Sequence, residues 1–137
     1  MPLHTSHSQG GATVDLRDHF RGRDTASPVM RDSHASMILL IDRLEIEFPE
    51  TDIWLLTSHD RLVLMDSPTY DGGDWLVIVH SILGEEHNIS YGMPHSVSPF
   101  PRGAEVHATA RGLEEAVAFV RIAMRESGGW PTSTELN

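Results

Sequence analysis

The chain has 137 residues, carries a formal net charge of −10 and contains no cysteine. Its length suits one domain of ordinary size, and the lack of cysteine excludes disulfides, zinc–thiolate sites, iron–sulfur clusters and a thiol nucleophile. The acidity argues against nucleic-acid binding, which depends on Lys and Arg at the phosphates. All ten basic residues are arginine, and the excess of acids lies beyond residue 36.

The sequence gives no sign of a membrane or export segment. It contains no run of 18 apolar residues, and the first 20 residues lack the apolar core of a secretory signal. We therefore expect a cytoplasmic protein without a membrane partner.

The first 32 residues are rich in Ser, Thr, Gly, His, Asp and Arg and show no sustained hydrophobic period. Such composition predicts a flexible N-terminal tail, residues 1–32, in which Val14, Leu16 and Phe20 could dock as a short turn. Residues 33–137 are then a single α+β domain.

A helix is predicted from residue 33 to residue 48. Asp32 or Ser33 can cap it, and Pro49 stops it. Apolar residues follow at helical spacing, although a strand at residues 37–41 is an alternative. These residues are Met37, Ile38, Ile41, Leu44 and Phe48.

Four strands are predicted next, as an antiparallel meander over residues 52–57, 61–66, 75–83 and 88–92. The connections between them are rich in turn residues, above all Pro68, Gly72 and Gly73. In the third strand Val77 and Val79 share one face, while Ile78 and His80 share the other.

Residues 93–112 contain several prolines and glycines and are predicted to be a long loop, with a short strand around Val106 as one option. A helix follows over residues 113–127, with acids in its first turn, arginines in its last turn and a left-handed cap at Gly128-Gly129. Residues 132–136 could add an edge strand. The fold class is therefore α+β: a single antiparallel meander of four to five strands, with a helix before it and a helix after it.

No catalytic, cofactor or metal motif is present. The sequence contains no G-x-x-x-x-G-K, G-x-G-x-x-G or H-E-x-x-H pattern. Asp66, Asp71 and Asp74 surround a glycine pair but lack the ligand order of an EF-hand. We therefore expect no enzyme, no cofactor and no bound metal.

Acidic and aromatic residues in the connections are the candidates for partner binding. An acidic surface steers a basic protein into contact, although acidity also serves solubility. The candidates are Asp60, Asp66, Tyr70, Asp71, Asp74, Glu85 and Glu86.

The order of the strands, together with a helix that begins Leu113-Glu114-Glu115-Ala116-Val117 and leads to Gly128-Gly129-Trp130-Pro131, resembles a known family. It is similar to the small immunity proteins of bacterial polymorphic toxin systems, especially those paired with deaminase-type toxins in actinobacteria. The resemblance implies a non-enzymatic antitoxin that occludes the active site of a cognate, basic, nucleic-acid-targeting toxin.

Two other interpretations stay open. One is a small ligand-binding or enzymatic α+β domain that uses His80, His87 or His95 in a pocket. The other is a subunit that only scaffolds a larger complex.

Overall fold

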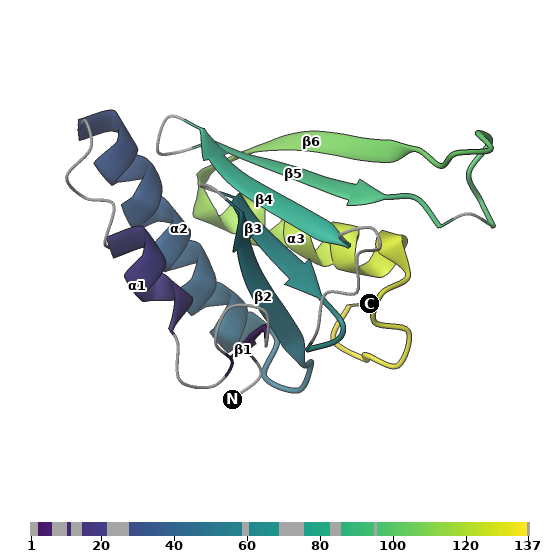
Figure 1. Cartoon of the computed structure of the whole chain (residues 1–137), viewed down its shortest axis with the longest axis horizontal. Helices are drawn as coiled ribbons and strands as arrows, with labels where there is room; N and C mark the ends of the chain where they lie inside the picture. The colour runs from purple at the N-terminus through teal and green to yellow at the C-terminus, as the bar shows by residue number, and fades with distance from the viewer. Residues whose placement is uncertain are drawn as a thin grey trace.

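A computed structural model describes residues 3–6, 11, 15–21, 28–58, 61–68, 76–82, 86–94 and 96–136 of the chain. Within these residues the fold is α+β, with one six-stranded sheet and three helices (Figure 1). The strands are β1 (Leu3–Thr5), β2 (Ile53–Ser58), β3 (Arg61–Met65), β4 (Val77–Ile82), β5 (Glu86–Gly92) and β6 (Glu105–Arg111). The helices are α1 (Leu16–Arg21), α2 (Pro28–Glu47) and α3 (Gly112–Ser127).

The six strands lie in the sheet in chain order. Strands β2 to β6 form an antiparallel meander, whereas β1 pairs parallel with β2. The α+β class and the meander are confirmed, but the expectation of four to five strands, all antiparallel, is wrong. The sequence LHT of β1 carries no strand pattern of its own, and its pairing with Ile53 spans most of the N-terminal half of the chain.

Both predicted helices exist. The helix before the meander starts at Pro28, earlier than expected, and proline suits the first helical position because the N–H that it lacks would have no helical partner there. The helix after the meander ends as predicted: Gly128 has φ +77° and its N–H bonds to the Arg125 carbonyl. Positive φ is a conformation in which glycine costs little.

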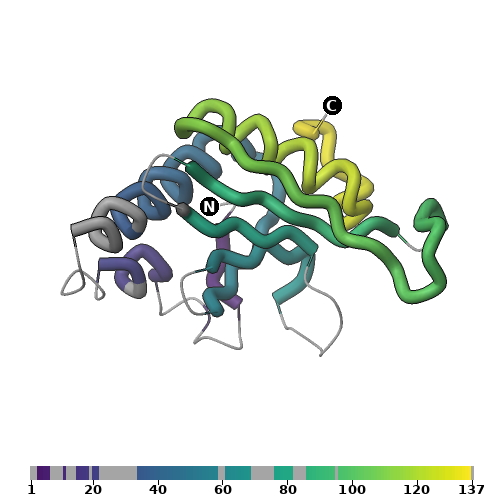
Figure 2. The backbone as a smooth tube through the Cα atoms, turned by 90° about the horizontal axis from the view of Figure 1, so that it is seen from above, coloured from purple at the N-terminus to yellow at the C-terminus, as the bar shows by residue number. Residues whose placement is uncertain are grey.

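The core lies between the sheet and helices α2 and α3, which Figure 2 shows together on one side of the sheet. Ile53, Leu62 and Val79 point into it from three strands, and Leu44 and Val120 meet them from the helices. The alternation of Val77 and Val79 with exposed His80 agrees with the predicted faces of this strand.

Parts of the first 32 residues are packed against the domain, including Leu16 and Phe20, which we expected to be able to dock. Leu16 and Phe20 on α1 are 4% and 0% exposed and belong to the core. Arg17 donates hydrogen bonds to Asp42 at 2.6 Å and to Glu45 at 2.9 Å, both on α2. The hydrophobic pair at i, i+4 therefore signals a short docked helix rather than a turn.

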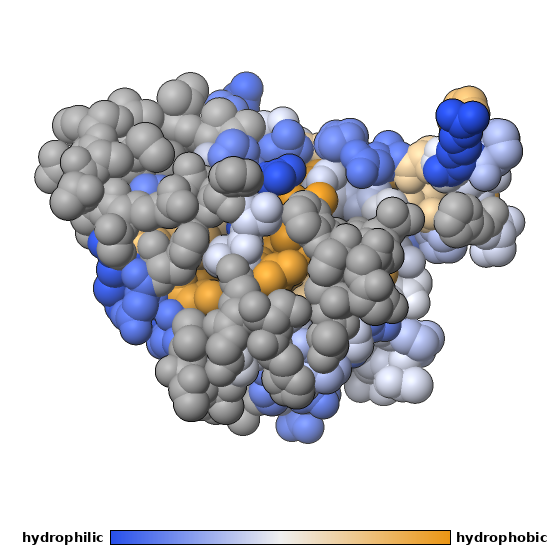
Figure 3. Space-filling view, viewed as in Figure 1, coloured by the Kyte–Doolittle hydropathy of each residue, from blue (hydrophilic) through white to orange (hydrophobic). Residues whose placement is uncertain are grey.

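A second apolar cluster occupies the other face of the sheet. Leu56, Val63 and Met65 are buried in it, and Trp54 and Ile78 pack at its edge. Figure 3 shows apolar residues gathered over the middle of this face. Strand β3 is thus covered on both faces, as its unbroken apolar run predicts.

The end of the β5–β6 hairpin projects beyond the rest of the molecule (Figures 1 and 2). Residues 105–111, expected within a long loop, form a full strand, and their register with β5 is continuous. Residues 132–136, in contrast, form turns rather than an edge strand. The two alanines in EVHATAR weaken the local strand signal, so pairing with β5 decides the conformation.

No helix of the described residues has both the length and the apolar character needed to cross a bilayer.

Candidate functional site

A pocket of about 320 Å³ opens at the end of the sheet where β2 begins and β3 ends. Three segments that are far apart in the sequence line it. They are the turn after α2 (Glu50, Thr51, Asp52), the residue after β3 (Asp66) and residues 129–135. Its volume is at the lower end of the range typical of ligand pockets.

Trp130 attaches the C-terminal segment to the sheet. Its side chain is 8% exposed and belongs to the core, and its Nε1–H donates to the backbone carbonyl of Asp52 at 2.9 Å. Gly129, just before it, packs against Leu76, where an added Cβ would lie 2.5 Å from Cδ1. The Gly128-Gly129-Trp130-Pro131 sequence therefore has a structural role: Gly128 ends α3, and the three residues after it form one wall of the pocket.

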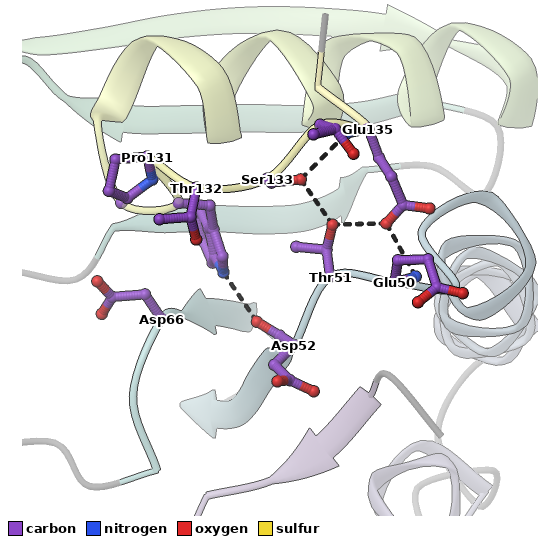
Figure 4. A pocket seen from close by; sticks show the side chains of 11 residues that line it. Glu50, Thr51, Asp52, Asp66, Pro131, Thr132, Ser133 and Glu135 are labelled. Carbon is purple, nitrogen blue, oxygen red and sulfur yellow. Dashed lines mark hydrogen bonds between the residues drawn. The ribbon is translucent and has the colours of Figure 1, made fainter.

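A hydrogen-bond network holds the opposite wall (Figure 4). The buried Thr51 hydroxyl donates to Glu135 Oε1 at 2.6 Å and lies 2.7 Å from the Ser133 hydroxyl. The Glu50 N–H donates to the same Glu135 oxygen at 2.9 Å. A carboxylate that accepts two short bonds is well held, since hydrogen bonds to charged groups are about twice as strong as neutral ones.

Two carboxylates beside the pocket remain accessible. Asp52 immediately precedes β2 and Asp66 immediately follows β3, and the pairing of Trp54 with Met65 places them at the same end of neighbouring strands. The side chain of Asp52 is 77% exposed and contacts His4 Nε2 at 2.9 Å. With Glu50 and Glu135, four acids line the pocket, and no lining residue is basic.

Several arginines of the described chain pair with acids elsewhere. Arg17 is held between α1 and α2, Arg43 pairs with Glu114, and Arg121 pairs with Glu47 at 2.7 Å. These pairs neutralise charge on the helical side. The lining of the pocket, in contrast, has four acids and no arginine.

The structure places two of the seven predicted partner-binding residues. Asp66 lines the pocket and is exposed. Glu86 starts β5, where it is half-buried and lies opposite Arg111. The antiparallel strands put Asp66 and Glu86 at opposite ends of the sheet. The remaining candidates lie outside the described residues: Asp60, Tyr70, Asp71, Asp74 and Glu85.

The histidines of the alternative interpretation do not converge. His80 is exposed on the face of β4 away from the helices. His87 is 1% exposed on the core side, where its Nε2 lies 3.0 Å from the Ser36 hydroxyl, and burial lowers its pKa from the usual 6.5. His95 lies outside the described residues. The acidic pocket contains no histidine.

The described residues contain no group of three or more His, Cys, Asp or Glu side chains arranged to hold a metal ion.

Sequence reasoning missed most of this pocket. Glu50, Asp52 and Glu135 are single acids that follow the ends of helices, and no local pattern connects residue 50 with residue 135. The available signal was Trp130 itself. A tryptophan is usually buried, so one that follows two glycines after a helix indicates that the chain packs back against the domain there.

Comparisons with protein-family models, with curated proteins and with solved structures found no match for this chain.

Proposed function

We propose that this chain is an immunity protein that binds a cognate toxin and blocks its nucleic-acid-binding active site. The contact surface in this proposal is the acidic pocket and its rim, with Asp52 and Asp66 as the accessible charges. The observation that carries the proposal is the set of four carboxylates around one pocket with no basic residue among its lining.

The chemistry of the pocket suits a basic side chain of a protein partner. A lysine or arginine that enters it would be surrounded by carboxylates, and charge-assisted hydrogen bonds to carboxylates are short and strong. A toxin that acts on nucleic acid needs such residues to hold phosphates. An inhibitor that pairs with them excludes the substrate.

The net charge of −10 supports the same proposal at longer range. Complementary charge increases the rate at which two proteins meet, and salt weakens this effect. Rapid capture matters for an inhibitor that must reach its toxin before the toxin reaches its substrate.

Co-expression tests this function. The product of the neighbouring gene, expressed alone in a bacterial host, should stop growth, and co-expression of this chain should restore growth. The two proteins should also co-purify. If the neighbouring product is harmless alone, or if the two proteins do not co-purify, the proposal is wrong.

Paired charge variants locate the contact. D52N/D66N removes two exposed charges at the pocket, and D18N/E114Q removes two exposed charges on α1 and at the start of α3, with side chains 72% and 79% exposed. Both variants reach the same net charge. Only D52N/D66N should fail to rescue growth, and equal rescue by both would contradict the proposed surface.

A further inference from the structure

Strand β6 is one margin of the sheet, and of the described strands only β5 pairs with it (Figure 1). It has seven residues, whereas β1 at the other margin has three. Long edge strands expose N–H and C=O groups that pair with another strand, and proteins commonly block them with lysine, proline or a bulge. The sequence EVHATAR has neither lysine nor proline, and its register with β5 shows no bulge.

The hydrogen-bonding pattern shows which groups face outward. The Met93 N–H donates to the Ala104 carbonyl at 2.8 Å, and these residues continue the register of β5 with β6. Since hydrogen-bonded and non-hydrogen-bonded pairs alternate, the main-chain groups of Val106, Ala108 and Ala110 face β5. Those of the odd-numbered residues 105 to 111 face outward. The contact of Arg111 is consistent with this pattern, because its N–H donates to the side chain of Glu115 at 3.3 Å and not to β5.

We propose that this edge pairs with β6 of a second copy of the chain, antiparallel across a two-fold axis at Ala108. In this register Glu105 of each copy lies opposite Arg111 of the other, and His107 lies opposite Thr109. The strand is thus complementary to itself in charge, and opposite charges placed across antiparallel strands are stabilising. The small side chain of Ala108 suits the close, non-hydrogen-bonded pair at the axis.

The helix side of the edge offers apolar contact at the same place. Glu115, Phe119 and Ile122 lie at helical spacing on one side of α3. Because the Glu115 side chain accepts the outward-facing N–H of Arg111, this side of the helix lies beneath the outer edge of β6. Phe119 is half-buried and Ile122 is 41% exposed. About nine residues of helix have the same length as about four residues of strand. Counted from Gly112 in both directions, Phe119 and Ile122 on α3 therefore lie near the level of Ala108 on β6.

This inference does not depend on the proposed function. It uses β6 and α3, and neither contributes a residue to the lining of the acidic pocket. A two-fold pair would therefore leave both pockets open, and each copy could bind its own partner.

The mass of the full-length chain in solution tests the pairing. Light scattering with size exclusion should give twice the 15.2 kDa chain mass. E105R places arginine opposite Arg111 twice per dimer, and R111E places glutamate opposite Glu105. Each single variant should weaken the dimer at least about tenfold, because like charges opposite each other are destabilising. The double variant E105R/R111E should restore it.

Ile122→Glu probes the helix side, and Ile46→Glu is its matched control. Ile46 is also an exposed isoleucine on a helix, 70% exposed on α2. I122E should weaken the dimer at least about tenfold, and I46E should not, while both should keep the melting temperature of the monomer unit. A monomeric wild-type chain, or a dimer that resists both the charge changes and I122E, would overturn the proposal.

Discussion

Thr51 donates its hydroxyl hydrogen to Glu135 at 2.6 Å and so connects the start of the sheet to the last residues of the chain, 84 positions later. The same glutamate oxygen accepts the Glu50 N–H. Together with the Trp130 bond to the Asp52 carbonyl, these contacts give the acidic pocket two fixed walls. A binding surface that is held in place before the partner arrives loses less conformational entropy on binding.

Thr51→Val should release the C-terminal wall of the pocket. The substitution keeps the size of the buried side chain but removes the hydroxyl that two partners share. We expect the free energy of unfolding to fall by about 1–3 kcal/mol, the usual range for a buried partner left unsatisfied. Urea denaturation measures this, and faster amide exchange in residues 130–136 should accompany it. Thr132→Val, at an exposed position of the same segment, is the control.

Two substitutions of Trp130 separate the contribution of its hydrogen bond from that of its packing in the core. Trp130→Phe keeps the ring in the core but loses the N–H donor, and should cost about 1 kcal/mol. Trp130→Ala also leaves a cavity and should cost about 3–5 kcal/mol. Equal losses in urea denaturation would show that the hydrogen bond, and not the packing of the ring, holds the segment.

Arg17 should determine whether α1 stays docked. Arg17→Ala removes the hydrogen bonds to Asp42 and Glu45, and leaves Glu45, whose side chain is 23% exposed, without this partner. The expected loss is about 1–3 kcal/mol. Limited proteolysis near α1 should become faster. Arg21→Ala, which removes only an exposed pair with Asp18 on the same helix, should change stability by less than about 0.5 kcal/mol.

His87 should make the fold sensitive to acid. Burial lowers its pKa below the usual 6.5, so the unfolded chain binds a proton more readily than the folded chain. Its contribution to stability is full above pH 6.5 and is lost as the pH falls toward the pKa of the folded state. Chemical denaturation at several pH values should show less acid destabilisation for His87→Gln than for wild type. The control His80→Gln, at an exposed position, should retain the wild-type dependence of stability on pH. If His87→Gln also retains it, His87 is not the source of the acid sensitivity.

The elements that local patterns predict are those with strong periodicity. The apolar stripe of α3, its glycine cap and the alternation in β4 were sufficient for correct prediction. Strand β1 and helix α1 are short, and their conformations depend on contacts with β2 and α2 that no local window contains. Tertiary pairing also decides β6, whose alanines have weak strand preference.

The candidate site was predictable only in part, for a related reason. Asp66 was identified because it follows an apolar strand and precedes a turn. The residues around it come from the turn after α2 and from the C-terminal segment, and only the folded chain brings them together. The acidic character could be read from composition, whereas its position could not.

The most direct test of the acidic pocket as a partner-binding surface is the dissociation constant for the purified product of the neighbouring gene, measured by titration calorimetry at low and high salt. We predict that D52N/D66N weakens binding at least about tenfold, or about 1.4 kcal/mol, while D18N/E114Q at the same net charge changes it less than about threefold. Wild-type binding should also weaken as salt increases. Equal affinities for the two double variants would contradict the account.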